Sequence, residues 1–324
     1  MLQREEVMVR QSFSSIAREL KISTAVVSNV MRNTSSTTLA SRATKQRILD
    51  SAWRNGVRLN NNVGIFVPEE VHKNENLFYP AFAGIAERCA QLGFGTFHVN
   101  SSEPKTIPDF LKKRDVNGVI FWNHCSEELL NFVEEEKIPS VVLNPLDKSI
   151  FPDFISFDDY GTLTELLEYL HGKGYSKYFF FLRDDGTEYS RSLIAAHRDF
   201  LSAHAVSGQL FPQDLTNTRE LEERVVKSDV GTVFITLSRF DTVKVLESFA
   251  KLHKKFPADG GVVGSSVLAD FYTPKLTTMV NPFYEGGLKV VDMIAEKWET
   301  RAFRLGKRII LKGKIIKNPS TGGE

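Results

Sequence analysis

The sequence predicts an all-α segment at the N-terminus and a larger α/β body with parallel sheets arranged in two lobes. Residues 14–53 contain short stretches with apolar residues at helical spacing. From residue 63 onward, short apolar runs alternate with amphipathic stretches, which is typical of strands covered by helices on both faces. The alternation comes in two successive series, which favours two lobes with a ligand cleft between them. We place the head at residues 1–60 and the body at 61–324.

The composition is that of an ordinary soluble globular protein. The chain has 324 residues, of which 42% are hydrophobic and 25% are charged. It shows no apolar run of the roughly 18 residues that span a bilayer, and the N-terminus has no apolar signal core. The two cysteines, Cys89 and Cys125, do not have the spacing of a metal site. We therefore expect a cytoplasmic protein with no membrane contact, no metal and no cofactor.

Charge is distributed unevenly along the chain. Residues 1–60 contain ten basic and four acidic side chains, so the head carries a charge of +6, although the whole chain carries only +1. A basic head on a mildly acidic body is typical of a nucleic-acid-binding module attached to a separate domain. Charge alone leaves open a chance imbalance over sixty residues.

The head divides into three short predicted helices. The first spans residues 14–20, with Ser12 or Ser14 available as its N-cap. After a tight break at Lys21–Ile22, Ser23 caps a second helix. The second helix buries a stripe of apolar residues: Val26, Val27, Val30 and Met31. Its outward residues are small or polar: Thr24, Ala25, Ser28, Asn29 and Arg32. Two short helices with such an outer face predict a helix-turn-helix that enters a DNA groove, although a generic helical hairpin remains the alternative.

The third helix follows a polar loop and is capped by Ser41. We expect its apolar residues to close the core of the head: Ile48, Leu49, Ala52 and Trp53.

The stretches SFSSIARELKISTAVVSNVMRN and SRATKQRILDSAWRNGVRLNN resemble the head of the lactose/galactose repressor (LacI/GalR) family. The family pattern is matched at Ala17, Ser23, Val27, Ser28, Ser41 and Thr44. It is departed from at Val26, Asn29 and Lys45, where the family usually has Thr, Arg and Arg. The resemblance implies a homodimeric, sequence-specific regulator that binds an operator in double-stranded DNA. A repressor is the expected role, although the sequence leaves open whether binding represses or activates. The candidate DNA contacts are Ser12, Ser14, Ser23, Thr24, Ala25, Ser28, Asn29 and Arg32.

The junction after the head is short. In the resembled family a further helix follows the head and wedges a leucine into the minor groove. Here GVRLNNN leads almost directly into VGIFVPEE, an apparent buried strand, so we expect a tight tether, no wedge and nearly straight bound DNA.

The resemblance extends over the body and implies a periplasmic-binding-protein-like fold. Predicted strands lie at 63–68, 96–100, 118–123, 140–144, 154–159, 177–184, 232–237, 260–265 and 308–317. The tail from LTTMVNP to RIILKGKIIK resembles the family's return crossing between lobes. One lobe is then expected at about 63–157 and 283–301, and the other at about 158–282 and 302–318.

Several positions that bind sugar in the family have changed. Leu193 stands where an Arg is usual, Leu237–Ser238 where Asn-Asp is usual, and Ser266 where an Asp is usual. Asn144 keeps a polar group, Asn281 replaces a Gln or Arg, and Arg191 lies near the lost Arg. The candidate effector positions are Glu69, Phe78, Tyr79, Asn144, Asp158, Arg191, Leu193, Ser238, Ser266 and Asn281. Two readings stay open: an effector less polar than a sugar, or a body that chiefly dimerises the heads.

No motif predicts catalysis. The chain lacks HExxH, GxSxG and the GxxxxGK[ST] phosphate loop, so we expect no enzyme. His124–Cys125 reads as a plain pair at a strand end, and Asp158–Asp159 as a helix cap or a contact between lobes. The alternative function is a solute-binding or sensing protein whose N-terminal helices contact protein rather than DNA.

Overall fold

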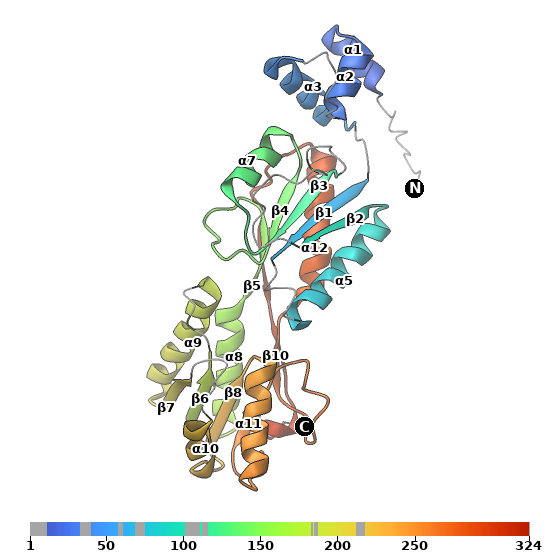
Figure 1. The fold of residues 1–324 in the computed structure, drawn as a ribbon. Helices are drawn as coiled ribbons and strands as arrows, with labels where there is room; N and C mark the ends of the chain where they lie inside the picture. The colour runs from blue at the N-terminus through green and yellow to red at the C-terminus, as the bar shows by residue number, and fades with distance from the viewer. Residues whose placement is uncertain are drawn as a thin grey trace, which may run out of the picture. The chain divides into compact units, whose positions relative to one another are not determined.

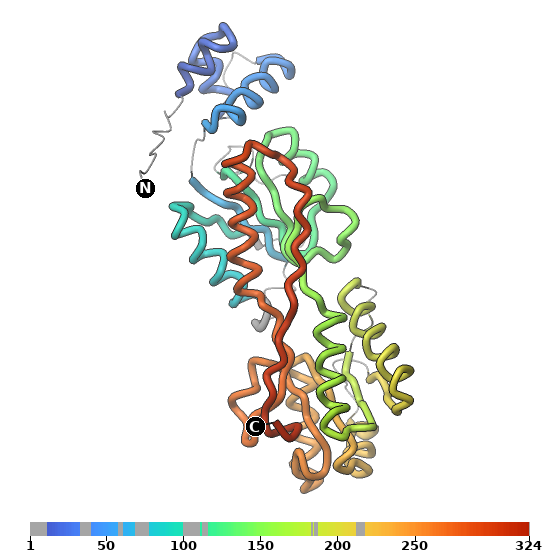
Figure 2. The backbone as a smooth tube through the Cα atoms, turned by 180° about the vertical axis from the view of Figure 1, so that it is seen from behind, coloured from blue at the N-terminus to red at the C-terminus, as the bar shows by residue number. Residues whose placement is uncertain are grey.

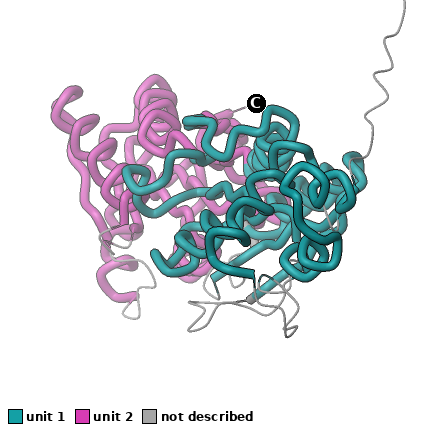
Figure 3. The backbone as a smooth tube through the Cα atoms, turned by 90° about the horizontal axis from the view of Figure 1, so that it is seen from above, with its two compact units in different colours: residues 1–156, 283–309 teal, residues 157–282, 310–324 magenta. Residues whose placement is uncertain are grey.

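The computed structural model describes residues 12–32, 40–57, 61–68, 75–100, 111, 116–182, 184, 187–211 and 218–323. Two compact units make up the chain. Unit 1 comprises residues 1–156 and 283–309, and unit 2 comprises residues 157–282 and 310–324. Figure 3 distinguishes them by colour. The chain crosses between the units three times, so each unit is built from two separate segments of the sequence.

Unit 1 begins with three helices, shown in blue in Figure 1: α1 (Phe13–Leu20), α2 (Thr24–Met31) and α3 (Arg42–Arg54). The Ser23 and Ser41 hydroxyls accept hydrogen bonds from the first turns of α2 and α3, which confirms both caps. A small core of buried residues holds the helices together: Ile16, Ala17, Val27, Val30, Met31, Ile48, Leu49, Ala52 and Val57.

One expectation for this core was wrong. Trp53 does not join it; its ring packs on Trp298 and Phe303 of the same unit, at centroid distances of 4.4 and 6.0 Å. Helical spacing predicts which face of α3 is apolar, but not which of two apolar partners a residue at the edge of that face will contact.

The remainder of unit 1 is an α/β layer structure. Among the described residues its sheet has six strands in the order β11-β5-β4-β3-β1-β2. Their bounds are β1 (Asn62–Val67), β2 (Gly95–Asn100), β3 (Gly118–Trp122), β4 (Ser140–Leu143), β5 (Phe154–Asp158) and β11 (Arg308–Lys312). The pairs that link β2, β1, β3, β4 and β5 are parallel, which confirms the expected parallel α/β body.

Helices cover both faces of this sheet. Helix α7 (Glu127–Glu135) packs on one face, and α5 (Glu75–Gln91) and α12 (Phe283–Thr300) lie side by side on the other (Figures 1 and 2). Helices α5 and α12 approach closely because glycines face each other: a Cβ on Gly84 would lie 2.1 Å from the Tyr284 carbonyl oxygen, and one on Gly287 2.2 Å from that of Ala81.

Unit 2 repeats the pattern. Its parallel sheet has the order β7-β6-β8-β9 in the part of the chain that is described. The strands are β6 (Lys177–Phe181), β7 (Ser207–Phe211), β8 (Thr232–Thr236) and β9 (Gly261–Val263). The helices are α8 (Asp159–Gly172), α9 (Glu188–His204), α10 (Arg219–Val226) and α11 (Arg239–Lys251).

The C-terminal segment differs from the expectation of one strand over 308–317. It forms β11 in the sheet of unit 1 and β12 (Lys314–Ile316), which pairs antiparallel with β10 (Thr278–Val280) in unit 2, before a short η1 turn (Pro319–Thr321). The second segment of unit 1 ends at residue 309, within β11. The backbone N–H groups of Leu305 and Lys307 bond to Asp153, which holds this segment on the sheet of unit 1.

Candidate nucleic-acid interface and effector positions

The turn between α1 and α2 is three residues long. Lys21 ends α1 in the left-handed region, with φ of 54°, and its N–H donates to carbonyls of the last turn. Ser23 then starts α2 by accepting a hydrogen bond of 3.3 Å from the Val26 N–H. Only residues 21–23 therefore separate α1 from α2, as expected for a helix-turn-helix.

The outward side of α2 carries the predicted DNA contacts. Thr24, Ala25 and Arg32 are exposed, and Ser28 and Asn29 are partly exposed, while Val27, Val30 and Met31 are buried beneath them. Small side chains on such a face allow close approach of the helix to base edges.

The remaining predicted contacts lie where helices begin. Ser12 and Ser14 are exposed at the start of α1, and Ser23 is exposed at the start of α2. The Ser12 side chain makes no cap bond, although its carbonyl accepts from the Ser15 hydroxyl at 2.7 Å. Exposed hydroxyls at helix starts are groups that hydrogen-bond to phosphate oxygens.

A polar network joins α1 to α3 and fixes their geometry. Glu19 accepts hydrogen bonds from Ser51 at 2.7 Å and from Arg54 and Asn55 at 3.0 Å. The Ser51 hydroxyl, followed by Asn55 and the Arg54 charge, lowers the pKa of Glu19 against an opposing effect of burial. These bonds occupy the Glu19 carboxylate within the head.

In unit 1, Asn144 follows β4 with a positive φ of 55°, and its amide donates to the Asn123 side chain at 3.3 Å. Phe78 is buried in α5, where its ring stacks on Phe82, whereas Tyr79 is 62% exposed. Glu69 lies outside the described residues.

In unit 2, polar side chains follow three strands, and each has a structural partner. Asp158 caps α8 by accepting from the Gly161 N–H at 2.8 Å, in agreement with the helix-cap reading of this pair. Ser238 caps α11 in the same way, with a bond of 3.0 Å from the Asp241 N–H. Asn281 donates to Asp159 at 2.8 Å.

The other three effector positions of unit 2 differ in exposure. Arg191 is exposed on α9, and Ser266 is partly exposed after β9. Leu193 is fully buried in the apolar core under α9 and packs there instead of reaching the surface.

Sequence reasoning missed Asn123 and underrated Asp159. Both directly follow a strand, and a polar residue immediately after a buried strand is the signal that would have singled them out. Asp159 is buried and bonded to Asn281, so these two side chains act as a pair within unit 2.

Three further observations concern the cysteines, metal-ligating side chains and membrane-spanning helices. Burial raises the pKa of both Cys89 and Cys125 to about 12, so the thiols stay protonated at neutral pH. No group of three metal-ligating side chains occurs within the described ranges. In that part of the chain no helix is long and apolar enough to cross a bilayer.

A scan against models of known protein families found no match. Among curated proteins, the HTH-type transcriptional regulator RegA of Clostridium acetobutylicum is 25% identical over 50% of this chain, and the match covers about half, 52%, of RegA. The catabolite control protein A of Staphylococcus xylosus is 21% identical over 84% of this chain and 88% of its own length.

Solved structures match the fold over most of the chain. A transcriptional regulator CelR–cellobiose complex aligns with a TM-score of 0.67 at 18% identity and covers 96% of this chain and 100% of its own. A LacI family transcriptional regulator from Enterococcus faecium with bound ribose aligns with the same TM-score and identity and covers 81% of this chain and 99% of its own. The chain therefore has the fold of LacI-family transcriptional regulators, and both comparisons confirm the resemblance to that family seen in its sequence.

Proposed function

We propose that this protein is a dimeric, sequence-specific DNA-binding regulator whose head is a helix-turn-helix. The outer face of α2 carries the proposal, because exposed Thr24, Ala25 and Arg32 stand on a helix whose opposite face is anchored in the core of the head. The charge of +6 on residues 1–60 supports it, since phosphate contacts supply much of the affinity for DNA.

Two copies are needed to bind two half-sites related by two-fold symmetry. Large aromatic side chains remain exposed on each unit: Phe97 in unit 1 and Phe240 and Phe271 in unit 2, with exposed fractions of 42, 62 and 80%. Exposed rings of this kind are candidates for the subunit interface that such a dimer needs. Repression is the regulatory outcome that we propose, because the resemblance of the head to the LacI/GalR family implies it.

The DNA assignment is tested with the full-length protein and two matched variants. Ala25→Glu adds a negative charge on the outer face of α2, and Ala83→Glu adds the same charge on the exposed face of α5. Titration of each against a labelled random duplex at low salt should show binding by the wild type and by Ala83→Glu, and a loss of tenfold or more for Ala25→Glu, about 1.4 kcal/mol. Equal binding by all three proteins would favour the alternative, a sensing protein whose head contacts other proteins.

We further propose that the body binds a small-molecule effector with fewer hydrogen-bonding groups than a sugar. The two regulators of similar fold were solved with cellobiose and ribose. In this chain, however, Asp158 and Ser238 are engaged as helix caps and Leu193 is buried. Fewer polar groups are therefore available to hold the hydroxyls of a sugar.

A thermal-shift screen with sugars, sugar acids, nucleosides and amino acids tests this proposal, because a ligand that binds the folded state raises the melting temperature. We expect a compound other than a neutral sugar to raise the melting temperature, and we expect Asn144→Ala or Asn281→Ala to reduce that rise. A blank across all classes with DNA binding intact would instead favour a body that serves to dimerise the heads.

A further inference from the structure

One residue of the head is buried outside the core of the head. Trp53 is only 8% exposed, yet it does not belong to the apolar cluster of α1, α2 and α3. Its burial comes from the rest of unit 1, where its ring contacts Trp298 at the end of α12 and Phe303 in the following loop. The Trp53 side chain is thus buried by contacts with a part of unit 1 outside the head.

The contact is directional as well as apolar. The Trp53 indole N–H donates to the Arg301 carbonyl oxygen at 3.0 Å. Gly56, just after α3, lies so close to Arg301 that a Cβ there would be 2.0 Å from the guanidinium, and it has a φ of +66°. Trp298, Arg301 and Phe303 therefore form a surface, called the platform below, that contacts α3 and the turn after it.

Ion pairs surround this aromatic contact. Lys45 of α3 pairs with Glu136 at the end of α7, and Glu136 is itself buried. Arg42 pairs with Glu135 at 2.9 Å and Lys137 with Asp50 at 3.6 Å, both at the surface. The surface pairs contribute little, whereas the pair with Glu136 involves a buried carboxylate, where losing the cation costs more.

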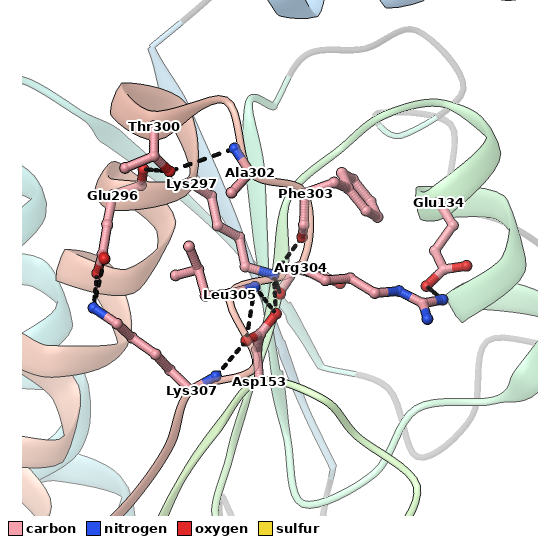
Figure 4. A network of polar contacts seen from close by, with 11 residues as sticks. Glu134, Asp153, Glu296, Lys297, Thr300, Ala302, Phe303, Arg304, Leu305 and Lys307 are labelled. Carbon is pink, nitrogen blue, oxygen red and sulfur yellow. Dashed lines mark hydrogen bonds and ion pairs between the residues drawn. The ribbon is translucent and has the colours of Figure 1, made fainter.

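Polar contacts of Lys297 and Asp153 anchor the loop that carries the platform. Figure 4 shows Lys297 of α12, which pairs with Asp153 at 2.7 Å and donates to the Phe303 carbonyl oxygen at 2.9 Å. Asp153 in turn accepts from the Leu305 N–H at 3.1 Å. The loop that receives Trp53 is thus fixed to the sheet of unit 1.

The docking contact is not packed like a core. A cavity of about 40 Å³ remains between α3 and the sheet of unit 1, lined in part by Leu49, Trp53, Asn117, Glu136 and Trp298. A void of this size is larger than the gaps usual in a protein core, so the apolar packing here is incomplete.

The junction between head and sheet is short in sequence. Residues 55–57 form a turn and β1 begins at Asn62, so no two-turn helix fits between head and sheet. The exposed face of α2 is left uncovered by the docking contact, since Thr24, Ala25 and Arg32 are all exposed.

We propose that docking of Trp53 onto the platform couples the head to the body, in place of the further helix that follows the head in the LacI/GalR family. The docked state sets the direction of α2 relative to the sheet of unit 1, and a change of state in the body acts on DNA by tightening or releasing this contact. The inference rests on the proposed function for its DNA consequence, while the docking itself is independent of it.

Hydrogen–deuterium exchange of the full-length protein tests the docking. Phe303→Ala removes a platform ring without altering any residue of the head, and Arg304→Ala is the matched control, because Arg304 lies on the same loop but pairs with Glu134. Amides of residues 42–57 should exchange roughly two- to tenfold faster in Phe303→Ala, the factor that corresponds to an aromatic contact, and at the wild-type rate in Arg304→Ala. Equal exchange in the two variants would overturn the proposal.

A charge swap gives an independent check. Lys45→Glu should accelerate exchange of residues 42–57, and Lys45→Glu with Glu136→Lys should restore protection at least in part. Absence of any restoration, together with normal exchange in Phe303→Ala, would mean that the contacts do not hold the head.

The DNA consequence is measured separately with Phe303→Ala. Binding to a random duplex should stay within about twofold of the wild type, because it depends on the charge of the head, while affinity for a selected operator should fall roughly two- to tenfold. Faster exchange with unchanged operator affinity would overturn the coupling but leave the docking. If the wild type binds neither duplex, the proposed function fails, and the exchange data still decide the docking.

Discussion

The buried pair of Lys297 and Asp153 makes a sharp prediction about stability. Their side chains are 2% and 1% exposed, and the Nζ–Oδ2 distance is 2.7 Å. Lys297 also donates to the carbonyl oxygens of Ser140 and Phe303, and Asp153 accepts from the Lys307 N–H at 2.9 Å. Lys297→Met removes the cation but leaves the buried carboxylate and two carbonyl acceptors in place.

The expected magnitude follows from this environment. Breaking a buried pair by removing one partner costs about 3–5 kcal/mol, because the remaining charge is uncompensated. The backbone donors to Asp153 remain and offset part of that cost, so we expect about 3 kcal/mol. Burial lowers the pKa of Lys297 while Asp153 opposes that effect, which indicates that the charged form depends on its partner. At 2–4 °C per kcal/mol for a domain of this size, the melting transition of unit 1 should fall by roughly 10 °C.

The assay is urea and thermal unfolding of the full-length protein, with Lys307→Gln as the control. Lys307 pairs at the surface with Glu296, which lies on α12 as Lys297 does, and such a surface pair contributes at most about 1 kcal/mol. A loss of about 3 kcal/mol for Lys297→Met and less than about 1 kcal/mol for Lys307→Gln is expected. Equal effects would refute the assignment of the buried pair as the element that holds the 301–307 segment.

Three further predictions concern unit 2 and DNA. Burial lowers the pKa of His197 to about 4, so the folded state binds fewer protons than the unfolded state below pH 6.5. The free energy of unfolding should therefore be highest above pH 6.5 and fall by about 3 kcal/mol as the pH drops to 4. Urea titrations of His197→Leu should show a correspondingly weaker pH dependence. Phe271→Asp should shift the protein from dimer to monomer in analytical ultracentrifugation if this exposed ring lies in the subunit interface, and an unchanged dimer would exclude the ring from it. Operator DNA should remain nearly straight in a circular-permutation assay, and a strong bend would contradict the absence of a minor-groove wedge.

Much of the fold was predictable because buried parallel strands read as continuous apolar runs. The predicted strands at 118–123 and 232–237 match β3 (Gly118–Trp122) and β8 (Thr232–Thr236) to within a residue. Strand β7 (Ser207–Phe211) was missed, because it is an edge strand whose residues are mostly exposed and show no apolar run. Helix α10 (Arg219–Val226) was missed for a similar reason, since it buries only Leu221 and Val225.

The sequence predicted the helix cap and buried stripe behind the candidate DNA face, but not the partners of polar and aromatic side chains elsewhere. Caps and helical spacing depend on neighbours along the chain, so Ser23 and the stripe of Val27 and Val30 could be predicted. The bond between Asn281 and Asp159 joins residues 122 positions apart, and the packing of Trp53 on Trp298 joins residues still further apart. Neither spacing nor composition predicts which distant partner a side chain will take.

Selection of bound duplexes from a randomised pool by the full-length protein tests the central claim most directly. A dimer of helix-turn-helix heads predicts enrichment of an inverted repeat, and Ala25→Glu on the outer face of α2 should abolish that enrichment while Ala83→Glu preserves it. Recovery of no enriched sequence, or enrichment that is unaffected by Ala25→Glu, would contradict the claim that α2 reads DNA.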